Sequence, residues 1–192
     1  MELRDWFAAD HRDLRTMFER TILQPMSRAM LTARPGETGN SIAWLMWHLA
    51  RVEDVVINTV VRARPQVLLA EGWAKRMGVD DARLGTAFRD DEVTAFGRTA
   101  DPEAVDAYWQ AVRGATTAWL KDVALPELDL VPDFDARIAT VPAILPKEGE
   151  WLLDFWRGRT AGWFLRFPVI DHGFLHLGQM QEIRGRLGVR GV

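Results

Sequence analysis

The sequence predicts an all-α protein, a four-helix bundle with long connections after its second and third helices. Four long stretches place apolar side chains at the three- and four-residue spacing of an amphipathic helix. Segments that contain proline and glycine separate these stretches. The chain has 192 residues, 48% of them hydrophobic, and no internal repeat, so we expect a single domain over residues 1–192.

The first helix is expected over residues 3–23. One stripe of it carries apolar side chains and a histidine at helical spacing: Phe7, His11, Leu14, Phe18 and Ile22. His11 therefore faces inward. It is either a histidine at the edge of the core, bonded to a neighbour, or a group that reaches a central site.

The second helix is expected to begin at Asn40 or Ser41, either of which can cap it, and to end near residue 64 before Pro65. His48 lies in the middle of this helix among large apolar residues. A histidine in that place is either a core residue bonded to a carbonyl group or a metal ligand.

The last two helices carry clear start and stop signals. Asp101 and Pro102 form a helix start, with an aspartate cap and proline in the first turn. The fourth helix is expected from near Thr160 to Leu187, with Pro168 either beginning it or kinking it.

The connections are less regular. Residues 65–100 are expected to form a long connection with a short helix at 91–97. Residues 125–150 contain four prolines and are expected to be irregular, with an extended piece at 137–141. A helical turn is expected at 151–156.

Composition excludes several kinds of site and partner. The chain has no cysteine, which excludes disulfides, thiolate metal ligands and a cysteine nucleophile, and which fits a cytoplasmic protein. Its net charge of -3 argues against nucleic-acid binding, and no apolar run is long enough to span a membrane. A phosphate-binding glycine loop and an H-E-x-x-H motif are both missing. We therefore expect a small-molecule substrate.

Three of the four histidines are expected to converge. His172 and His176 are four residues apart on the fourth helix, so both imidazoles lie on one face. Bundles build metal sites from facing helices, and His48 adds a third imidazole from the second helix. Three imidazoles with an open fourth position form the ligand set of a catalytic metal site. Zinc, nickel, cobalt and ferrous iron all accept this set, and we expect zinc or nickel.

Two segments resemble a known family. They are similar to the two signature segments of the DinB-like superfamily. The first covers residues 40–54, N-S-I-A-W-L-M-W-H-L-A-R-V-E-D, and the second covers residues 171–179, D-H-G-F-L-H-L-G-Q. The resemblance implies a four-helix bundle that holds one metal through three histidines, matched here by His48, His172 and His176. It also implies a glutamine after the histidine pair, matched by Gln179.

The resemblance leaves three functions open. Some members of the superfamily are S-transferases or isomerases that use mycothiol or bacillithiol, and others are assigned as metal-dependent hydrolases. The third possibility is a non-catalytic protein that binds a metal or a ligand. A bound metal lowers the pKa of a thiol or of water. We favour thiol transfer, in which the thiolate must arrive with a cofactor because the chain has no cysteine.

Further residues are candidates for supporting roles. His11 is the candidate general acid or base, Asp54 could orient a ligating imidazole, and Trp44 could form a wall of the pocket. Other expected wall residues are Leu45, Val52, Val169 and Met180. The connection at 65–100 is expected to form a lid that recognises the cofactor through Arg76, Arg83 or Arg89. The aromatic residues between 151 and 167 predict either a homodimer interface or a surface covered by the connections.

Overall fold

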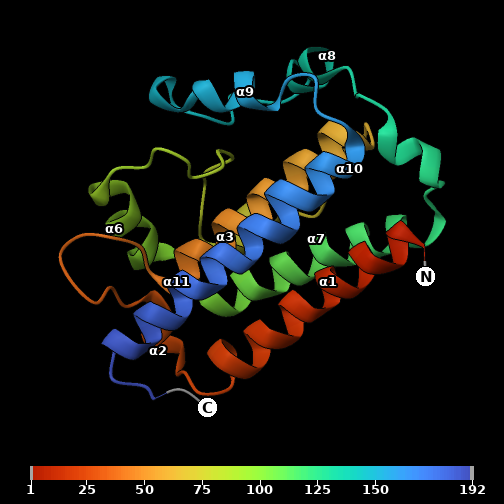
Figure 1. The fold of residues 1–192 in the computed structure, drawn as a ribbon. Coiled ribbons are helices and arrows are strands. Elements are labelled where there is room, and N and C mark those ends of the chain that lie inside the picture. The colour runs from red at the N-terminus through yellow and green to blue at the C-terminus, as the bar shows by residue number, and fades with distance from the viewer. Residues whose placement is uncertain (1, 191–192) are drawn as a thin grey trace.

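The computed structural model describes residues 2–190, and four long helical rods dominate it (Figure 1). The rods are α1 (Leu3–Phe18) with the π-helical segment Glu19–Leu23, α3 (Ile42–Glu53) with the π-helical segment Asp54–Val61, α7 (Pro102–Asp122), and α10 (Ala161–Phe164) with the π-helical segment Leu165–Asp171 and α11 (His172–Arg186). These bounds confirm the predicted all-α fold, and residues 2–190 contain no strand. No helix in that range is both long and apolar enough to cross a bilayer.

The four rods form a bundle in which α1 and α3 occupy opposite corners, because each packs against α7 and α11. Side-chain contacts show that α3 and its π-helical extension run parallel to α7. Arg51 contacts Tyr108, and further along both rods Arg62 contacts Ala115. A parallel pair needs a crossover connection, which residues 62–101 supply.

The connections contain more helix than the sequence predicted. They hold α2 (Arg28–Thr32), α4 (Val67–Ala70), α5 (Trp73–Met77), α6 (Asp90–Thr99), α8 (Phe134–Ile138) and α9 (Trp151–Trp156), with 3-10 turns at Leu125–Asp129 and Lys147–Gly149. The helices expected at 91–97 and 151–156 are present as α6 and α9. The extended piece expected at 137–141 is wrong, because Asp133 caps α8, which ends at Ile138, and residues 139–141 form a turn.

Every residue of α3 is buried. The helix is apolar on nearly all faces, and α7, α11 and α6 of the crossover pack around it. Burial of the whole helix places His48, at 6% exposure, in the interior of the protein.

Pro168 neither begins nor ends the fourth rod. The rod begins at Ala161, capped by the Thr160 hydroxyl, and passes through Pro168 within its π-helical segment. Proline lacks the N–H of a regular helix, and a wider π turn gives its ring room. The segment ends at Asp171, so the π turn directly precedes the first histidine of α11.

Candidate metal centre

The side chains of His48, His172 and His176 meet between α3 and the first two turns of α11. The Nε2 atom of His172 lies 2.7 Å from Nε2 of His176 and 3.3 Å from Nε2 of His48. The ligand atoms that the three residues offer all lie within 4.8 Å of one another. Within residues 2–190 no other group of histidine and acidic side chains forms such a cluster.

Each ring is anchored through its second nitrogen. The Nδ1–H of His48 donates to the carbonyl of Leu84 (2.6 Å), that of His172 to the carbonyl of Pro168 (3.2 Å), and that of His176 to the side-chain oxygen of Gln179 (2.6 Å). Carbonyl oxygens can only accept, so each neutral ring carries its proton on Nδ1 and keeps a lone pair on Nε2. Partners of this kind orient the histidines of metal sites.

The arrangement fits a divalent transition ion. Lone pairs that face one another at these distances repel unless a cation lies between them. In a tetrahedral zinc site with bonds of about 2.05 Å, ligand nitrogens lie about 3.3 Å apart. The distance between His48 and His172 matches this value, and the shorter one between His172 and His176 needs only a small opening.

Burial keeps the three rings neutral. It lowers the pKa of His48 to about 4, with help from the charge of His176. Burial, followed by the charges of His48 and His176, lowers the pKa of His172 to about 2, and burial lowers the pKa of His176 as well. Neutral imidazole is the form that binds metal, so protons compete weakly for this site near neutral pH.

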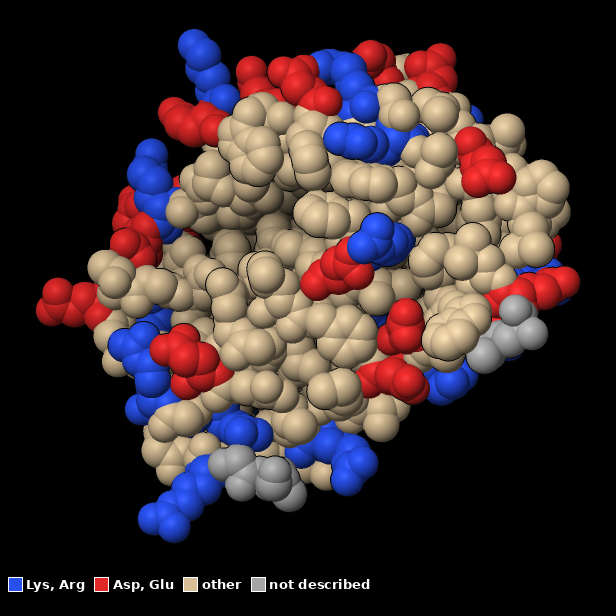
Figure 2. All heavy atoms as spheres, viewed as in Figure 1, with Lys and Arg blue, Asp and Glu red and all other residues tan. Residues whose placement is uncertain are grey.

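The open side of the cluster faces a cavity of about 510 Å³. Figure 2 shows a hollow on this face, between α9 and the long rods. Asn40 and Thr86 are the polar side chains that line the cavity beside the histidines, and no charged side chain from residues 2–190 lines it. Its apolar wall is largely aromatic: Trp44, Val52, Phe88, Trp151, Leu152, Phe155, Trp156, Phe167 and Pro168.

Two of the supporting residues chosen from the sequence lie at the cluster. Trp44 stacks on the ring of His48, with centroids 5.1 Å apart and planes 8° from parallel. Gln179 accepts the hydrogen bond from His176.

Two other residues lie elsewhere, which corrects the sequence analysis. His11 is bonded to Glu53 at 2.9 Å and lines a different cavity. Asp54 is fully buried and accepts hydrogen bonds from Tyr108 and from the main chain at Val67 and Leu68. Asp54 therefore fixes the start of the crossover connection and orients no ligating histidine.

The cavity wall also differs from the expected one. Val52 lines it with Trp44, whereas Leu45, Val169 and Met180 are buried in the core and do not. The crossover does contribute through residues 85–88, but none of its three candidate arginines lines the cavity. Arg83 pairs with Asp81 and Glu92, Arg89 with Asp91, and Arg76 lies over the ring of Trp73.

The backbone groups that hold two of the histidines were not predicted from the sequence. Gly85 follows the carbonyl that anchors His48 and has a φ of +91°, which disfavours any residue with a side chain. A Cβ at this position would lie 2.8 Å from the ring of Trp47 and 2.9 Å from that of Trp44. The glycine in an otherwise irregular segment was the one signal that could have marked this close approach.

Fold and site together define a helical-bundle protein that presents three histidines from facing helices to one apolar cavity. A family model described as DinB superfamily matches residues 10–180, and the chain belongs to that superfamily. The crystal structure of a conserved protein from Enterococcus faecalis is similar in fold, with a TM-score of 0.72 and 20% identity over 99% of both chains. A search of curated proteins finds no match. Family and cluster support a metal-binding DinB-like protein.

Proposed function

We propose that the protein is a metal-dependent transferase that joins a low-molecular-weight thiol to an apolar electrophile. The observation that carries this proposal is the cavity at the histidine cluster, which is open to a ligand and mostly aromatic, and to which the described part of the chain contributes no charged side chain. The sequence contains no cysteine, so the thiol belongs to a cofactor such as mycothiol or bacillithiol.

The three histidines would hold the ion, zinc or nickel, through Nε2. When bound, the ion supplies a positive charge that lowers the pKa of a thiol beside it. Residues of the chain form the surroundings of the ion. Trp44 and the aromatic residues of α9 give the cavity an apolar wall, and electrostatic attraction inside it would strengthen once a bound substrate displaces water. The same surfaces accept an apolar substrate, and Asn40 and Thr86 offer it hydrogen bonds.

The charge-free wall favours thiol transfer over hydrolysis. Hydrolysis by a metal-bound hydroxide gains from a carboxylate or another acid or base that moves protons to the leaving group. Among the residues that the structure describes, no carboxylate lines this cavity, and His11 lines a different one. Addition of a thiolate to an electrophile needs less proton transfer, so it suits the site better.

The metal is tested first. We expect about one divalent ion per chain by elemental analysis, and we expect the ion to be lost when His48, His172 and His176 are all replaced by alanine. Leu175→Ala is the matched control, because Leu175 lies beside His176 on α11 and its side chain is 62% exposed. Full metal content in the triple variant would disprove the assignment.

The activity test mixes metal-loaded protein with monochlorobimane, with and without mycothiol or bacillithiol. Thiol-dependent conjugation that is lost in His48→Ala and kept in Leu175→Ala would support the transferase. Cleavage of an ester or amide without a thiol would favour a hydrolase. Metal binding without either activity would favour a non-catalytic protein.

A further inference from the structure

A cavity of about 460 Å³ lies at the end of the bundle where the second rod ends and the fourth begins. There α8 packs against the π-helical end of the second rod, and the 3-10 turn Leu125–Asp129 packs against α10 (Figure 1). The cavity shares no lining residue with the cavity at the histidines. Its charged lining residues are three arginines and two carboxylates: Arg62, Arg64, Arg137, Glu127 and Asp133.

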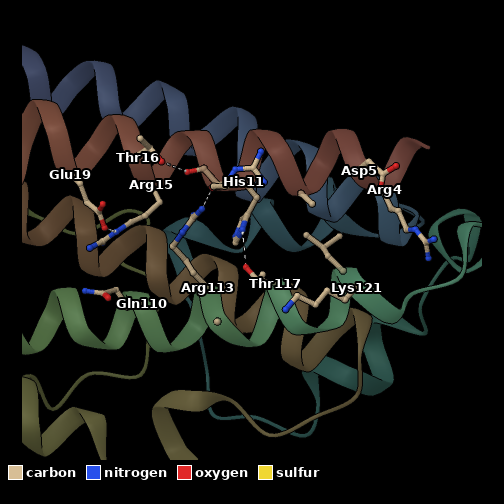
Figure 3. Close-up of a pocket in the computed structure, with 14 residues that line it drawn as sticks. Arg4, Asp5, His11, Arg15, Thr16, Glu19, Gln110, Arg113, Thr117 and Lys121 are labelled. Carbon is tan, nitrogen blue, oxygen red and sulfur yellow. Dashed lines mark hydrogen bonds and ion pairs between the residues drawn. The ribbon is translucent and has the colours of Figure 1, made fainter. Parts of the chain in front are cut away.

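None of these three arginines forms an ion pair with a residue in the range 2–190. A cavity of about 630 Å³ between α1 and α7 differs in this respect (Figure 3). The arginines that line that cavity all pair with carboxylates, and Figure 3 shows Arg15 beside its partner Glu19. They are Arg4, Arg12, Arg15 and Arg113. Arginines at the end of the bundle are therefore available to a ligand, whereas those between α1 and α7 are neutralised within the chain.

Arg62 and Arg137 each present one edge of the guanidinium group to solvent. Nη1 of Arg62 donates to the side-chain oxygen of Asn58 (2.7 Å) and to the carbonyl of Ala115 (3.4 Å), which leaves Nε and Nη2 unbonded among the described residues. Nη1 of Arg137 is enclosed, but its Nε and Nη2 are neither enclosed nor bonded within residues 2–190. Nε and Nη2 together form an edge that can bind two oxygens of one phosphate or carboxylate group.

Arg62 and Arg64 are like charges that line the same cavity. The chain leaves the second rod through Ala63, which has a φ of +52°, and the main-chain N–H of Arg64 donates to the carbonyl of Asn58 at 2.8 Å. Burial lowers the pKa of Arg62, and the positive charge of Arg64 lowers it further. An anion bound beside both groups would relieve their repulsion.

The two carboxylates of the cavity bind main-chain groups. Glu127 accepts the N–H of Ala124 at 3.3 Å, and Asp133 accepts the N–H of Ala136 at 3.2 Å, so each caps a short helical segment. Capping accounts for their presence in the lining. Three positive and two negative charges leave the lining with a net charge of +1.

Apolar side chains lie beside the arginines. Leu130 and Val131 line the cavity and are 62% and 55% exposed, and Trp119 and Pro132 line it with them. Leu130 is held in place, because its carbonyl accepts the N–H of Ala161 at 2.9 Å. Exposed apolar side chains that line a cavity favour the binding of an apolar group.

We propose that this cavity binds a phosphate monoester whose organic part is apolar. Phosphate oxygens accept from the Nε and Nη2 atoms of Arg62 and Arg137 and from Arg64, and the organic part packs against Trp119 and Leu130. Three guanidinium groups favour a dianion over a monoanion. The cavity exceeds the size of one phosphate ion and leaves room for the organic part. This site needs neither a metal nor a thiol, so it is independent of the proposed transferase.

The test is isothermal titration of the full-length, metal-free protein with phenyl phosphate, phenyl sulfate and inorganic phosphate near neutral pH. Phenyl sulfate has the shape of phenyl phosphate but one charge fewer, and inorganic phosphate has the charge without the apolar part. We expect phenyl phosphate to bind saturably and roughly tenfold more tightly than either. Removing the metal keeps phosphate oxygens from binding at the histidine cluster, and His172→Ala, titrated as a second check, should bind phenyl phosphate unchanged.

Arginine variants locate the site. Arg64→Gln and Arg137→Gln should each weaken the binding of phenyl phosphate roughly tenfold, the loss of one charge-assisted contact. Arg64 is exposed, so its replacement should leave the protein folded by circular dichroism. Arg98→Gln is the matched control, since Arg98 is exposed on α6, carries the same charge and lines neither this cavity nor the one at the histidines.

Two further variants test the charge and the apolar part separately. Glu127→Gln keeps an oxygen for the cap and removes a negative charge, so it should tighten the binding of phenyl phosphate roughly threefold. Leu130→Ser should weaken the binding of phenyl phosphate roughly threefold, the value of about 25 Å² of buried apolar surface, and leave that of inorganic phosphate unchanged.

Absence of saturable phenyl phosphate binding would overturn the proposal, as would unchanged binding in both arginine variants. Equal affinity for phenyl sulfate would also overturn it, because the site would then not select a dianion. Weaker binding in Glu127→Gln would show that the cavity prefers a cation. Binding that is lost in His172→Ala but kept in Arg64→Gln would place the ligand at the histidine cluster instead.

Discussion

Replacing Gln179 by leucine tests whether a histidine partner outside the ligand set controls metal affinity. The side-chain oxygen of Gln179 accepts the Nδ1–H of His176 at 2.6 Å, which fixes the proton on Nδ1 and the lone pair on Nε2. Leucine has a similar volume but cannot accept. In Gln179→Leu the ring of His176 can therefore rotate or move its proton to Nε2, and both changes compete with metal binding.

The exposure of Gln179 determines how much metal affinity Gln179→Leu should lose. Loss of such a partner commonly lowers metal affinity 10- to 100-fold. Gln179 is exposed, so water can replace its oxygen as acceptor, and this places the expected loss near the lower limit. We expect affinity to fall about tenfold, equivalent to about 1.4 kcal/mol. Gln179→Glu keeps an acceptor and adds a negative charge, so its affinity should equal or exceed that of the unaltered protein.

Competition with a chromophoric chelator measures both variants. Gln181→Leu is the matched control. Gln181 lies on the same helix, but its side chain donates a hydrogen bond to Thr21 and not to a histidine. Unchanged affinity in Gln179→Leu would refute the orienting role. Weaker binding in Gln179→Glu would refute the reasoning on tautomers.

Three further predictions concern stability and assembly. Gly85→Ala should lower the free energy of unfolding, measured in urea, by roughly 1–3 kcal/mol, because the alanine would have a positive φ and its Cβ would lie under 3 Å from two tryptophan rings. Unchanged stability would show that the crossover connection can move to make room for the Cβ. The metal-free protein should be fully stable above pH 6.5 and lose stability as the pH falls toward 4. This follows because the folded-state pKa of His48 is about 4 and that of His172 about 2, so the unfolded chain takes up protons first. A melting temperature that does not change between pH 6.5 and 4 would contradict the assignment of the pH dependence to these histidines, and so would a fall in His172→Ala as steep as that in the unaltered protein. Trp151 and Phe155 are 60% and 37% exposed, so we propose that they belong to a homodimer interface; sedimentation showing only monomer at micromolar concentration would remove that idea.

Helix positions and the convergence of the histidines could be predicted because both follow from periodicity. An apolar stripe fixes which face of a helix is buried, and on α11 this face carries His176. The second helix is apolar nearly all round and wholly buried, so His48 lies in the interior whichever way it points. The sequence shows that a side chain faces the interior of the bundle, but not which of the neighbouring helices it faces. Glu53 follows His48 by five residues and lies about 140° further round α3. His11 on α1 bonds to Glu53 across the diagonal of the bundle, so its side chain is turned away from the metal cavity.

The remaining parts of the site depend on tertiary contacts that leave no periodic signal. The carbonyls of Leu84 and Pro168 hold two of the rings, and any residue type provides a carbonyl. Residues 151–156 were expected to be helical, but nothing in their spacing shows that they line the cavity at the histidines. Asp54 was misplaced for a similar reason, since a buried carboxylate can cap a connection as readily as it can orient a ligand.

The two halves of the histidine cluster lie far apart in the chain, since His48 and His172 are 124 residues from each other. At usual rates of protein synthesis, this separation means that His48 is made roughly 6 to 25 s before its partners exist. Until His172 is made, a nascent chain can therefore present only one imidazole of the cluster, which would hold a divalent ion weakly. An ion held as proposed by all three histidines would be taken up only after His176 has been made and the bundle has closed. Metal content is thus a measure of intact, fully folded protein, and chains that stop short of α11 would be released without an ion.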